Sequence, residues 1–211
     1  MTEQTVAERL KYVVGETRCR LYDWRHNVQT CGDVAVASLG HVGENVDHAA
    51  PYMPSHPKFL DETIRNLAID YARYVFVDLG SGKGRVLLVA SEFPFARIQG
   101  VEFSRPLHDI AARNVRRYTS RSQRCKNVEP IHGDAIKYEF SRTPTVIFMF
   151  NPFQPAVLVP VLRKLEASIA ELPRDVVLLY MAPYYGDLVE RETSLRLVSE
   201  ERYHNQYRFT P

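Results

Sequence analysis

The sequence predicts an α/β protein built on a mainly parallel β-sheet, and two observations support this prediction. From Pro57 onward, short apolar segments of strand type alternate with amphipathic segments of helical type, as in β-α-β units. One strand, residues 74–79, runs directly into a glycine-rich loop and the first turn of a helix. With 211 residues, 45% hydrophobic and 25% charged, the chain is most simply one globular domain with an N-terminal extension.

The elements before the glycine loop are predicted from helical periodicity. Residues 2–14 predict a short helix with apolar side chains on one side. Residues 21–53 show no sustained period, although 34–37 could form a short strand. Residues 57–71 predict an amphipathic helix, because their apolar side chains recur at helical spacing and proline suits the first turn.

The elements after the loop alternate between strand and helix. Strands are expected at residues 97–102, 128–132, 145–150 and 175–181, and helices at 104–118, 154–172 and 187–191. The nearly unbroken apolar run of 145–150 predicts a central parallel strand. Residues 195–200 and 203–209 predict two strands with a short connection, which makes an antiparallel pair.

The glycine loop has the chemistry of a binding site for an anionic or zwitterionic ligand. Asp78 ends the strand, and Gly80, Gly82 and Gly84 follow at every second position. Glycine lets the backbone lie against a ligand, and a helix N-terminus offers unpaired N–H groups. The dinucleotide fingerprint requires a glycine where this chain has Arg85, and a pyrophosphate would be repelled by the acid. S-adenosylmethionine, with an amino group and a carboxylate, suits the loop better. Taken alone, the stretch is also compatible with an ordinary turn of another α/β domain.

Two further strands end in polar groups that fit the same ligand. The acid followed by G-x-G-x-G resembles the first motif of class I S-adenosylmethionine-dependent methyltransferases. Glu102 lies 22 residues beyond Gly80, where an acid can accept hydrogen bonds from ribose hydroxyls. Gly133-Asp134-Ala135 resembles the triplet of this family that contacts the adenine. The alternative for Asp134 is a turn acid that caps the segment after it.

The strand at 145–150 ends in Asn151-Pro152-Phe153. This triplet resembles the fourth motif of amine-directed methyltransferases, in which Asp, Asn or Ser is followed by two prolines and an aromatic residue. There the polar side chain and the next carbonyl accept hydrogen bonds from the target amine, and the ring packs on it. Only one proline is present here, so the match is partial, and a plain Asn-Pro turn is the alternative.

The resemblance covers residues 57–211 and implies a specific architecture. We expect a Rossmann-like seven-stranded sheet of order 3-2-1-4-5-7-6, with the last strand antiparallel and helices on both faces. The glycine loop with Lys83 is similar to that of a group of small methyltransferases, and in a general way to that of protein-lysine methyltransferases. Residues 1–56 form the extension, which we expect to fold over the pocket as a lid.

The resemblance also implies the site residues. Those expected to bind S-adenosylmethionine are Asp78, Gly80, Ser81, Gly82, Gly84, Glu102, Phe103, Asp134, Ala135 and Asn151. The catalytic candidates are Asn151, Pro152 and Phe153. Contacts to the methyl acceptor are expected from Tyr52, Phe153 and Tyr184, with plain packing as the alternative for Tyr52.

The predicted function is methyl transfer from S-adenosylmethionine to an amine nitrogen of a protein side chain or a small molecule. Alternatives are an RNA methyltransferase, a non-catalytic S-adenosylmethionine-binding domain and a dinucleotide-dependent oxidoreductase. The support for RNA is the stretch 116–126, which has several basic residues and no acidic one. A solvated helix end explains the same charges.

Composition limits the partners and the compartment. The formal net charge is +2, which gives no global argument for nucleic acid or membrane. No apolar run is long enough to span a bilayer, and no signal-peptide pattern is present, so a cytoplasmic protein is expected. No metal is expected, because the spacing of the histidines fits no common zinc motif; these are His41, His48 and His56. Free thiols are expected at Cys19, Cys31 and Cys125.

Overall fold

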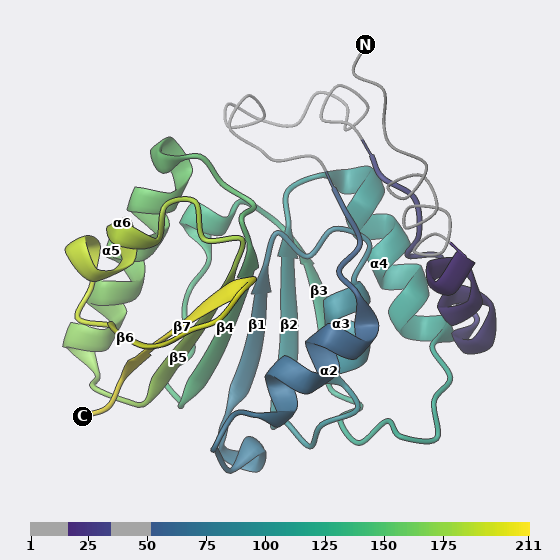
Figure 1. The fold of residues 1–211 in the computed structure, drawn as a ribbon, viewed down its shortest axis with the longest axis horizontal. Coiled ribbons are helices and arrows are strands. Elements are labelled where there is room, and N and C mark those ends of the chain that lie inside the picture. The colour runs from purple at the N-terminus through teal and green to yellow at the C-terminus, as the bar shows by residue number, and fades with distance from the viewer. Residues whose placement is uncertain (1–16, 35–51) are drawn as a thin grey trace.

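The computed structural model describes residues 17–34 and 52–211, which form a seven-stranded sheet with helices on both faces (Figure 1). The strand order is β3-β2-β1-β4-β5-β7-β6. Strands β1 to β5 run parallel, and β7 is antiparallel to both β5 and β6. The predicted fold class and strand order are therefore confirmed. The strands are β1 (Val75–Leu79), β2 (Arg97–Glu102), β3 (Val128–His132), β4 (Thr145–Phe150), β5 (Val176–Met181), β6 (Arg196–Glu200) and β7 (His204–Phe209).

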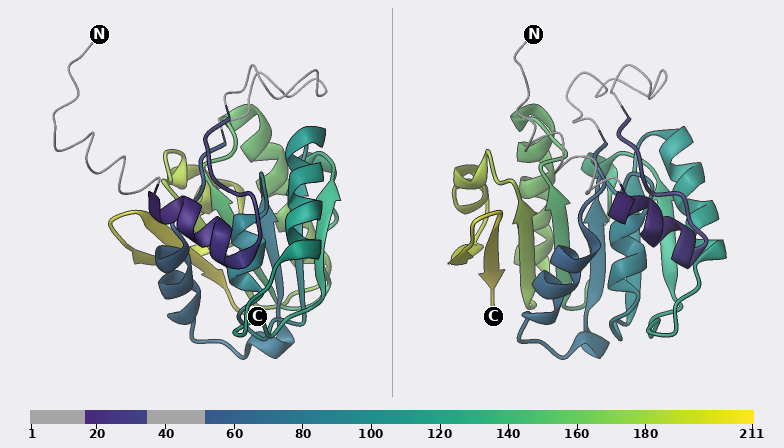
Figure 2. Two further views of the ribbon diagram at one scale, coloured as in Figure 1. Left: turned by 90° about the vertical axis from the view of Figure 1, so that its right-hand side faces the viewer. Right: turned by 45° about the vertical axis from the view of Figure 1, so that its right-hand side comes forward.

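Helices cover both faces of the sheet (Figures 1 and 2). Helices α2 and α3 pack on one face, whereas α5 and α6 pack on the other. A further helix, residues 17–26, lies beside α4, as both views in Figure 2 show. The elements are α2 (Pro57–Arg65), α3 (Arg85–Ala90), α4 (Arg105–Arg117), α5 (Pro155–Glu171), α6 (Gly186–Glu192) and the 3-10 turns η3 (Tyr71–Arg73) and η4 (Ala135–Lys137).

The alternation of side chains along β1 explains why the sheet is buried on both sides. Val75, Val77 and Leu79 face the core beneath α5, and Phe76 faces the core beneath α2 and α3. A parallel sheet covered by helices on both faces needs apolar residues at nearly every strand position. Asp78 follows the same alternation as Phe76, so the carboxylate lies at the end of β1 on the side of α3.

One predicted helix is shorter than expected. The helix predicted at 57–71 ends at Arg65, and a separate turn, η3, follows. The side chain of Asp70 accepts a hydrogen bond from the Ala72 N–H at 3.3 Å, so it caps the new turn. Such side-chain hydrogen bonds compete with continuation of a helix.

The helix at 17–26 was not predicted, because polar side chains interrupt its apolar spacing. Asp23 lies on its buried side and accepts hydrogen bonds from Thr30 and Cys31, which fold the following loop back onto it. The prediction of free thiols is wrong for Cys19 and Cys31, which form a disulfide with a Cα–Cα distance of 5.8 Å. An odd cysteine count does not preclude one bridge between nearby residues. Cys125 is a buried free thiol.

Other N-terminal predictions lie outside the described residues, including the helix at 2–14 and residues 35–37 of the predicted strand. Val34, where that strand was expected to begin, forms an isolated antiparallel bridge with Tyr52. Among residues 17–34 and 52–211, no helix combines the length and apolar character needed to cross a bilayer.

Candidate functional site

A cavity of about 490 Å³ opens at the carboxyl ends of β1, β2, β4 and β5. Parallel strands bring these ends to one edge of a sheet, which is where ligands bind in open α/β folds. Eleven predicted site residues line this cofactor cavity: Tyr52, Asp78, Gly80, Ser81, Gly82, Glu102, Phe103, Asn151, Pro152, Phe153 and Tyr184. Three predicted residues do not: Gly84, Asp134 and Ala135.

Asp78 is the most deeply buried acid of the cavity, with 2% of its surface exposed. Its Oδ2 atom has no hydrogen-bond partner within the described part of the chain. Burial, and secondarily the charge of Glu102, raises the pKa of the Asp78 carboxyl well above its usual range. A buried carboxylate oxygen without a partner, on the wall of a cavity, fits a ligand that donates a hydrogen bond or carries positive charge.

Glu102 fixes the glycine loop to the end of β2. Its two carboxylate oxygens accept hydrogen bonds from the backbone N–H groups of Gly82 and Ser104, each at 2.8 Å. Burial raises the pKa of the Glu102 carboxyl to about 7, although both N–H groups act in the opposite direction. Each carboxylate oxygen keeps a second lone pair, which can accept from the hydroxyls of a ligand.

The glycine loop is held between two other segments of the cavity wall. Gly80 and Gly82 have φ angles of +84° and +53°, which side-chain-bearing residues rarely adopt. A Cβ on Gly82 would lie 2.2 Å from the Tyr52 ring, and one on Gly80 would lie 2.6 Å from Cβ of Pro152. The loop therefore contacts the N-terminal segment on one side and the Asn-Pro-Phe segment on the other. Gly84 instead lies against Ala111 of α4.

The N-terminal segment is attached to the glycine loop by polar contacts that sequence reasoning missed. Lys83 donates hydrogen bonds from Nζ to the carbonyls of Cys31 and Gly32, at 2.6 and 2.8 Å. The Tyr52 hydroxyl donates to the Thr30 carbonyl at 2.7 Å. Buried Arg85 donates to Thr30 Oγ1 at 2.7 Å and forms an ion pair with Asp23 at 3.3 Å. The sequence did mark this position, because Arg85 stands where the dinucleotide fingerprint has a glycine. The partners of Arg85 could not be assigned from the sequence.

Asn151 adopts a left-handed backbone conformation at the end of β4, with φ of +37°. Asparagine tolerates this region better than most residues, and such conformations cluster at functional sites. The Tyr180 hydroxyl donates to Asn151 Oδ1 at 3.0 Å. Burial raises the pKa of Tyr180 to about 12, so the hydroxyl stays protonated and orients the amide. Asn151 Oδ1 keeps a lone pair for another donor.

Asp134 caps the segment that follows it, which is the alternative role given in the sequence analysis. Its carboxylate accepts from the Ile136 N–H at 2.9 Å and caps η4. Ala135, the next residue, is buried. The predicted role of both residues at the adenine stays a prediction.

The cavity residues fit S-adenosylmethionine, the cofactor of the predicted class. Asp78 provides a buried acceptor without a partner, the glycine loop provides a surface without side chains, and Glu102 provides lone pairs near it. Across residues 17–34 and 52–211, no group of three or more His, Cys, Asp or Glu side chains could hold a metal ion. His56 is exposed, and His41 and His48 lie outside the described residues.

Comparisons with known proteins agree with this geometry. A family model described as "Histone methylation protein DOT1" matches residues 49–152. None of the curated proteins matches the chain by sequence.

Solved structures with similar folds include several methyltransferases. A predicted N6-adenine-specific DNA methylase from Listeria monocytogenes has a TM-score of 0.55 and 12% identity, over 75% of this chain and 52% of that chain. The mitomycin 7-O-methyltransferase MmcR has a TM-score of 0.52 and 14% identity, over 72% and 52%. The methyltransferase domain of bacterial CtHen1 has a TM-score of 0.52 and 17% identity, over 72% and 97%. At these identities the likeness establishes the fold, and the chain spans about half the length of the first two.

Proposed function

We propose that this chain, a class I S-adenosylmethionine-dependent methyltransferase, transfers a methyl group to an amine nitrogen of a protein side chain or a small molecule. The observation that carries the proposal is the position of Asn151-Pro152-Phe153, which lines the cofactor cavity and contacts the glycine loop through Pro152. A segment that touches the donor site and presents oxygen acceptors is suited to hold an amine beside the methyl donor.

The cofactor would be held by the acids and the glycine loop. Asp78 would accept from the amino group of the methionine part, and Gly80 and Gly82, which have no side chains, would let the cofactor lie against the backbone of the loop. Glu102 would accept from the ribose hydroxyls, as at the corresponding position of other α/β nucleotide sites. Phe103 would flank the adenine, with Asp134 and Ala135 as further candidates.

The acceptor amine would be oriented by oxygen atoms rather than by charge. Asn151 Oδ1 and the Pro152 carbonyl would accept its N–H groups, while the rings of Phe153, Tyr184 and Tyr52 would wall the site and exclude water. S-adenosylmethionine supplies an electrophilic methyl group when it is bound. The described residues that line the cavity include no histidine or lysine. The amine must therefore arrive neutral, since no side chain assigned to the acceptor acts as a general base.

A protein acceptor is favoured over a small molecule within this proposal. The support is the match to a family model whose description names histone methylation. We extend only the chemistry of that description to this chain, namely transfer to the amine of a protein side chain.

The proposal also includes the domain arrangement and the compartment. Residues 57–211 would form the methyltransferase domain, and residues 1–56 would act as a lid. The support is the contacts of Tyr52, Cys31 and Gly32 with the glycine loop. A cytoplasmic location would make Cys19–Cys31 a bond that forms and breaks with redox conditions, because cytosolic thiols are mostly kept reduced.

The test is transfer of a labelled methyl group to fractionated cell extract. We expect label in the protein fraction, recovered after acid hydrolysis as a methylated amino acid with its methyl on a side-chain nitrogen. Asn151→Ala should reduce turnover while calorimetry shows unchanged cofactor affinity. Label on oxygen or sulfur atoms, or loss of cofactor affinity in Asn151→Ala with unchanged turnover per bound cofactor, would contradict the assignment.

Two alternatives give different results in the same assay. An RNA methyltransferase would label the RNA fraction, and the basic residues of 116–126 are the observation that favours it. A non-catalytic domain would bind the cofactor in calorimetry but release no S-adenosylhomocysteine with any fraction.

A further inference from the structure

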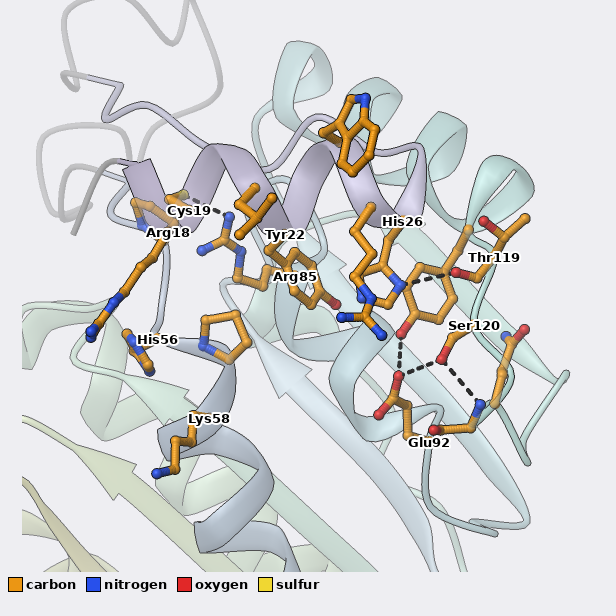
Figure 3. A pocket seen from close by; sticks show the side chains of 18 of the residues that line it. Arg18, Cys19, Tyr22, His26, His56, Lys58, Arg85, Glu92, Thr119 and Ser120 are labelled. Carbon is orange, nitrogen blue, oxygen red and sulfur yellow. Dashed lines mark hydrogen bonds between the residues drawn. The ribbon is translucent and has the colours of Figure 1, made fainter. Parts of the chain in front are cut away.

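A second cavity, larger than the first, lies outside the cofactor cavity (Figure 3). It has a volume of about 1490 Å³ and lies between the helix at 17–26, the segment 53–58 and the loop 118–126. Figure 3 shows Arg18, His56 and Lys58 at one end, and Glu92 and Ser120 at the other. We call this cavity the basic groove. It shares Met53 and Arg85 with the lining of the cofactor cavity, so the two cavities adjoin.

Positive charge is concentrated in the basic groove. Six lysine or arginine residues and two acids line it, although the whole chain has 27 basic and 25 acidic residues. Arg85 is buried and paired with Asp23, and the other five cations are exposed: Arg18, Arg25, Lys58, Arg121 and Lys126. The two acids are Asp33 and Glu92, and the Glu92 carboxylate accepts hydrogen bonds from Tyr118 and Ser120, each at 2.7 Å, so cations outnumber acids in the groove by six to two.

Planar side chains lie between these cations. The Tyr22 and His26 rings are 4.5 Å apart, and the His26 and Tyr118 rings are 5.2 Å apart and stacked. The His26 ring is fixed by contact of Nδ1 with the Thr119 carbonyl at 2.9 Å. Trp24, on the same helix, is 81% exposed. An indole this exposed contributes little to the core, so its planar surface is available to a ligand.

We propose that the basic groove binds a single-stranded nucleic acid. Single strands are bound by combining cations that follow the phosphates with aromatic rings on which unpaired bases stack. The basic groove supplies exposed cations from three different segments, together with the exposed Trp24 ring and the half-buried Tyr22 and His26 rings. Tyr118 is buried and supports the His26 ring by stacking on it. An acidic peptide would use the cations but not the planar surfaces, and the bases of a duplex are not free to stack on them.

This inference does not depend on which acceptor is methylated. The basic groove adjoins the cofactor cavity, so a bound strand would keep the enzyme close to nucleic acid during turnover. Binding can be measured without cofactor, and failure here would leave the proposed methyl transfer unaffected.

The test is fluorescence anisotropy of the full chain with a labelled single-stranded RNA of about 16 nucleotides, the upper range for a single binding module. Arg25→Ala combined with Arg121→Ala should weaken binding about tenfold and lower the salt slope by roughly 0.7 for each lost phosphate contact. The matched control is Arg73→Ala combined with Arg113→Ala, since both arginines are exposed and line neither cavity. The control should change affinity less than about twofold, because it removes equal charge elsewhere.

The aromatic part of the proposal has its own variants. Trp24→Ala should weaken binding about tenfold, and Trp24→Phe should restore most of it, because a base stacks on either ring. Calorimetric affinity for S-adenosylmethionine reports that each variant is folded. Equal binding by the Arg25/Arg121 and Arg73/Arg113 variants would overturn the inference. So would tighter binding of duplex DNA or of a poly-glutamate peptide than of the single strand.

Discussion

The cofactor cavity and the basic groove are neighbours with opposite electrostatics. The cofactor cavity has two acids, Asp78 and Glu102, each less than 5% exposed and each with a raised pKa. The basic groove has cations that are mostly exposed. Arg85 lines both.

This difference shows that buried charges and exposed charges contribute to binding in different ways. A buried acid has a large effect on a small ligand, because water does not screen it and its desolvation cost is already present in the fold. Exposed cations act weakly one at a time, and they suit a long ligand that contacts several of them. We therefore expect sharp single-residue effects in the cofactor cavity and distributed effects in the basic groove.

The largest expected effect is that of Asp78→Asn. The amide cannot replace the negative charge, so affinity for S-adenosylmethionine should fall by roughly 100-fold, as for the loss of a buried charged partner. The ligand-free protein should melt at the same or a higher temperature at pH 8, because a buried carboxylate without a partner is removed. Calorimetry and thermal denaturation measure these quantities. Asp109→Asn, at a partly exposed acid of α4 outside the cofactor cavity, is the control and should leave affinity unchanged. If the Asp78→Asn protein kept an affinity within threefold of the original, Asp78 would matter no more than the control acid. The contrast between sharp effects in the cofactor cavity and distributed effects in the basic groove would then be wrong.

The pH dependence should differ between the two cavities. Protonation of Glu102, whose pKa is about 7, should weaken S-adenosylmethionine binding about tenfold between pH 8 and pH 6. The raised pKa of Asp78 acts in the same direction. Nucleic-acid binding should not weaken over this range, since its phosphate contacts are made by arginine and lysine side chains rather than by carboxylates. Calorimetry and anisotropy at both pH values make the comparison.

The same acids should affect stability in the opposite direction. A carboxyl whose pKa is raised on folding binds more protons in the folded state, so stability increases as pH falls. For Glu102 this gain should appear between about pH 7 and its ordinary value of 4.5. A ligand-free protein whose melting temperature falls steadily from pH 7 to pH 5 would contradict the burial assigned to these acids.

The smallest expected effect is that of Tyr180→Phe. Loss of the hydroxyl removes one hydrogen bond to Asn151 Oδ1, worth about 1 kcal/mol, so kcat should fall about fivefold. Cofactor affinity should not change, because Tyr180 does not line the cofactor cavity. Tyr138→Phe is the matched control, since its buried hydroxyl bonds Gln99 on another part of the sheet. Equal loss of kcat in both variants would show general destabilisation rather than positioning.

The strands and the residues at their carboxyl ends could be predicted from the sequence, because strand geometry determines both. Apolar runs located the strands, and parallel pairing brings their carboxyl ends to one edge, so Asp78, Glu102 and Asn151 were expected together and lie together. The roles given to these residues stay predictions. Asp134 was ambiguous because a helical cap and a ligand contact both require an acid at a strand end, and the structure shows the cap.

The N-terminal segment could not be predicted in the same way. Its helix is held by Arg85, 62 positions from Asp23 in the sequence, and by a disulfide rather than by an apolar face. Contacts of this kind leave no periodic signal in a single sequence. The basic groove was missed for the same reason, because it forms only when residues 17–26 are placed beside 118–126.

The contact between Gly80 and Pro152 has a consequence for protein engineering. A side chain at position 80 would meet the proline ring at 2.6 Å, so the donor loop cannot be altered without displacing the segment assigned to the acceptor. Redesign of this enzyme for a modified cofactor should therefore require paired substitutions, chosen at positions 80 and 152 together. Libraries that vary only one of the two loops should return few active clones.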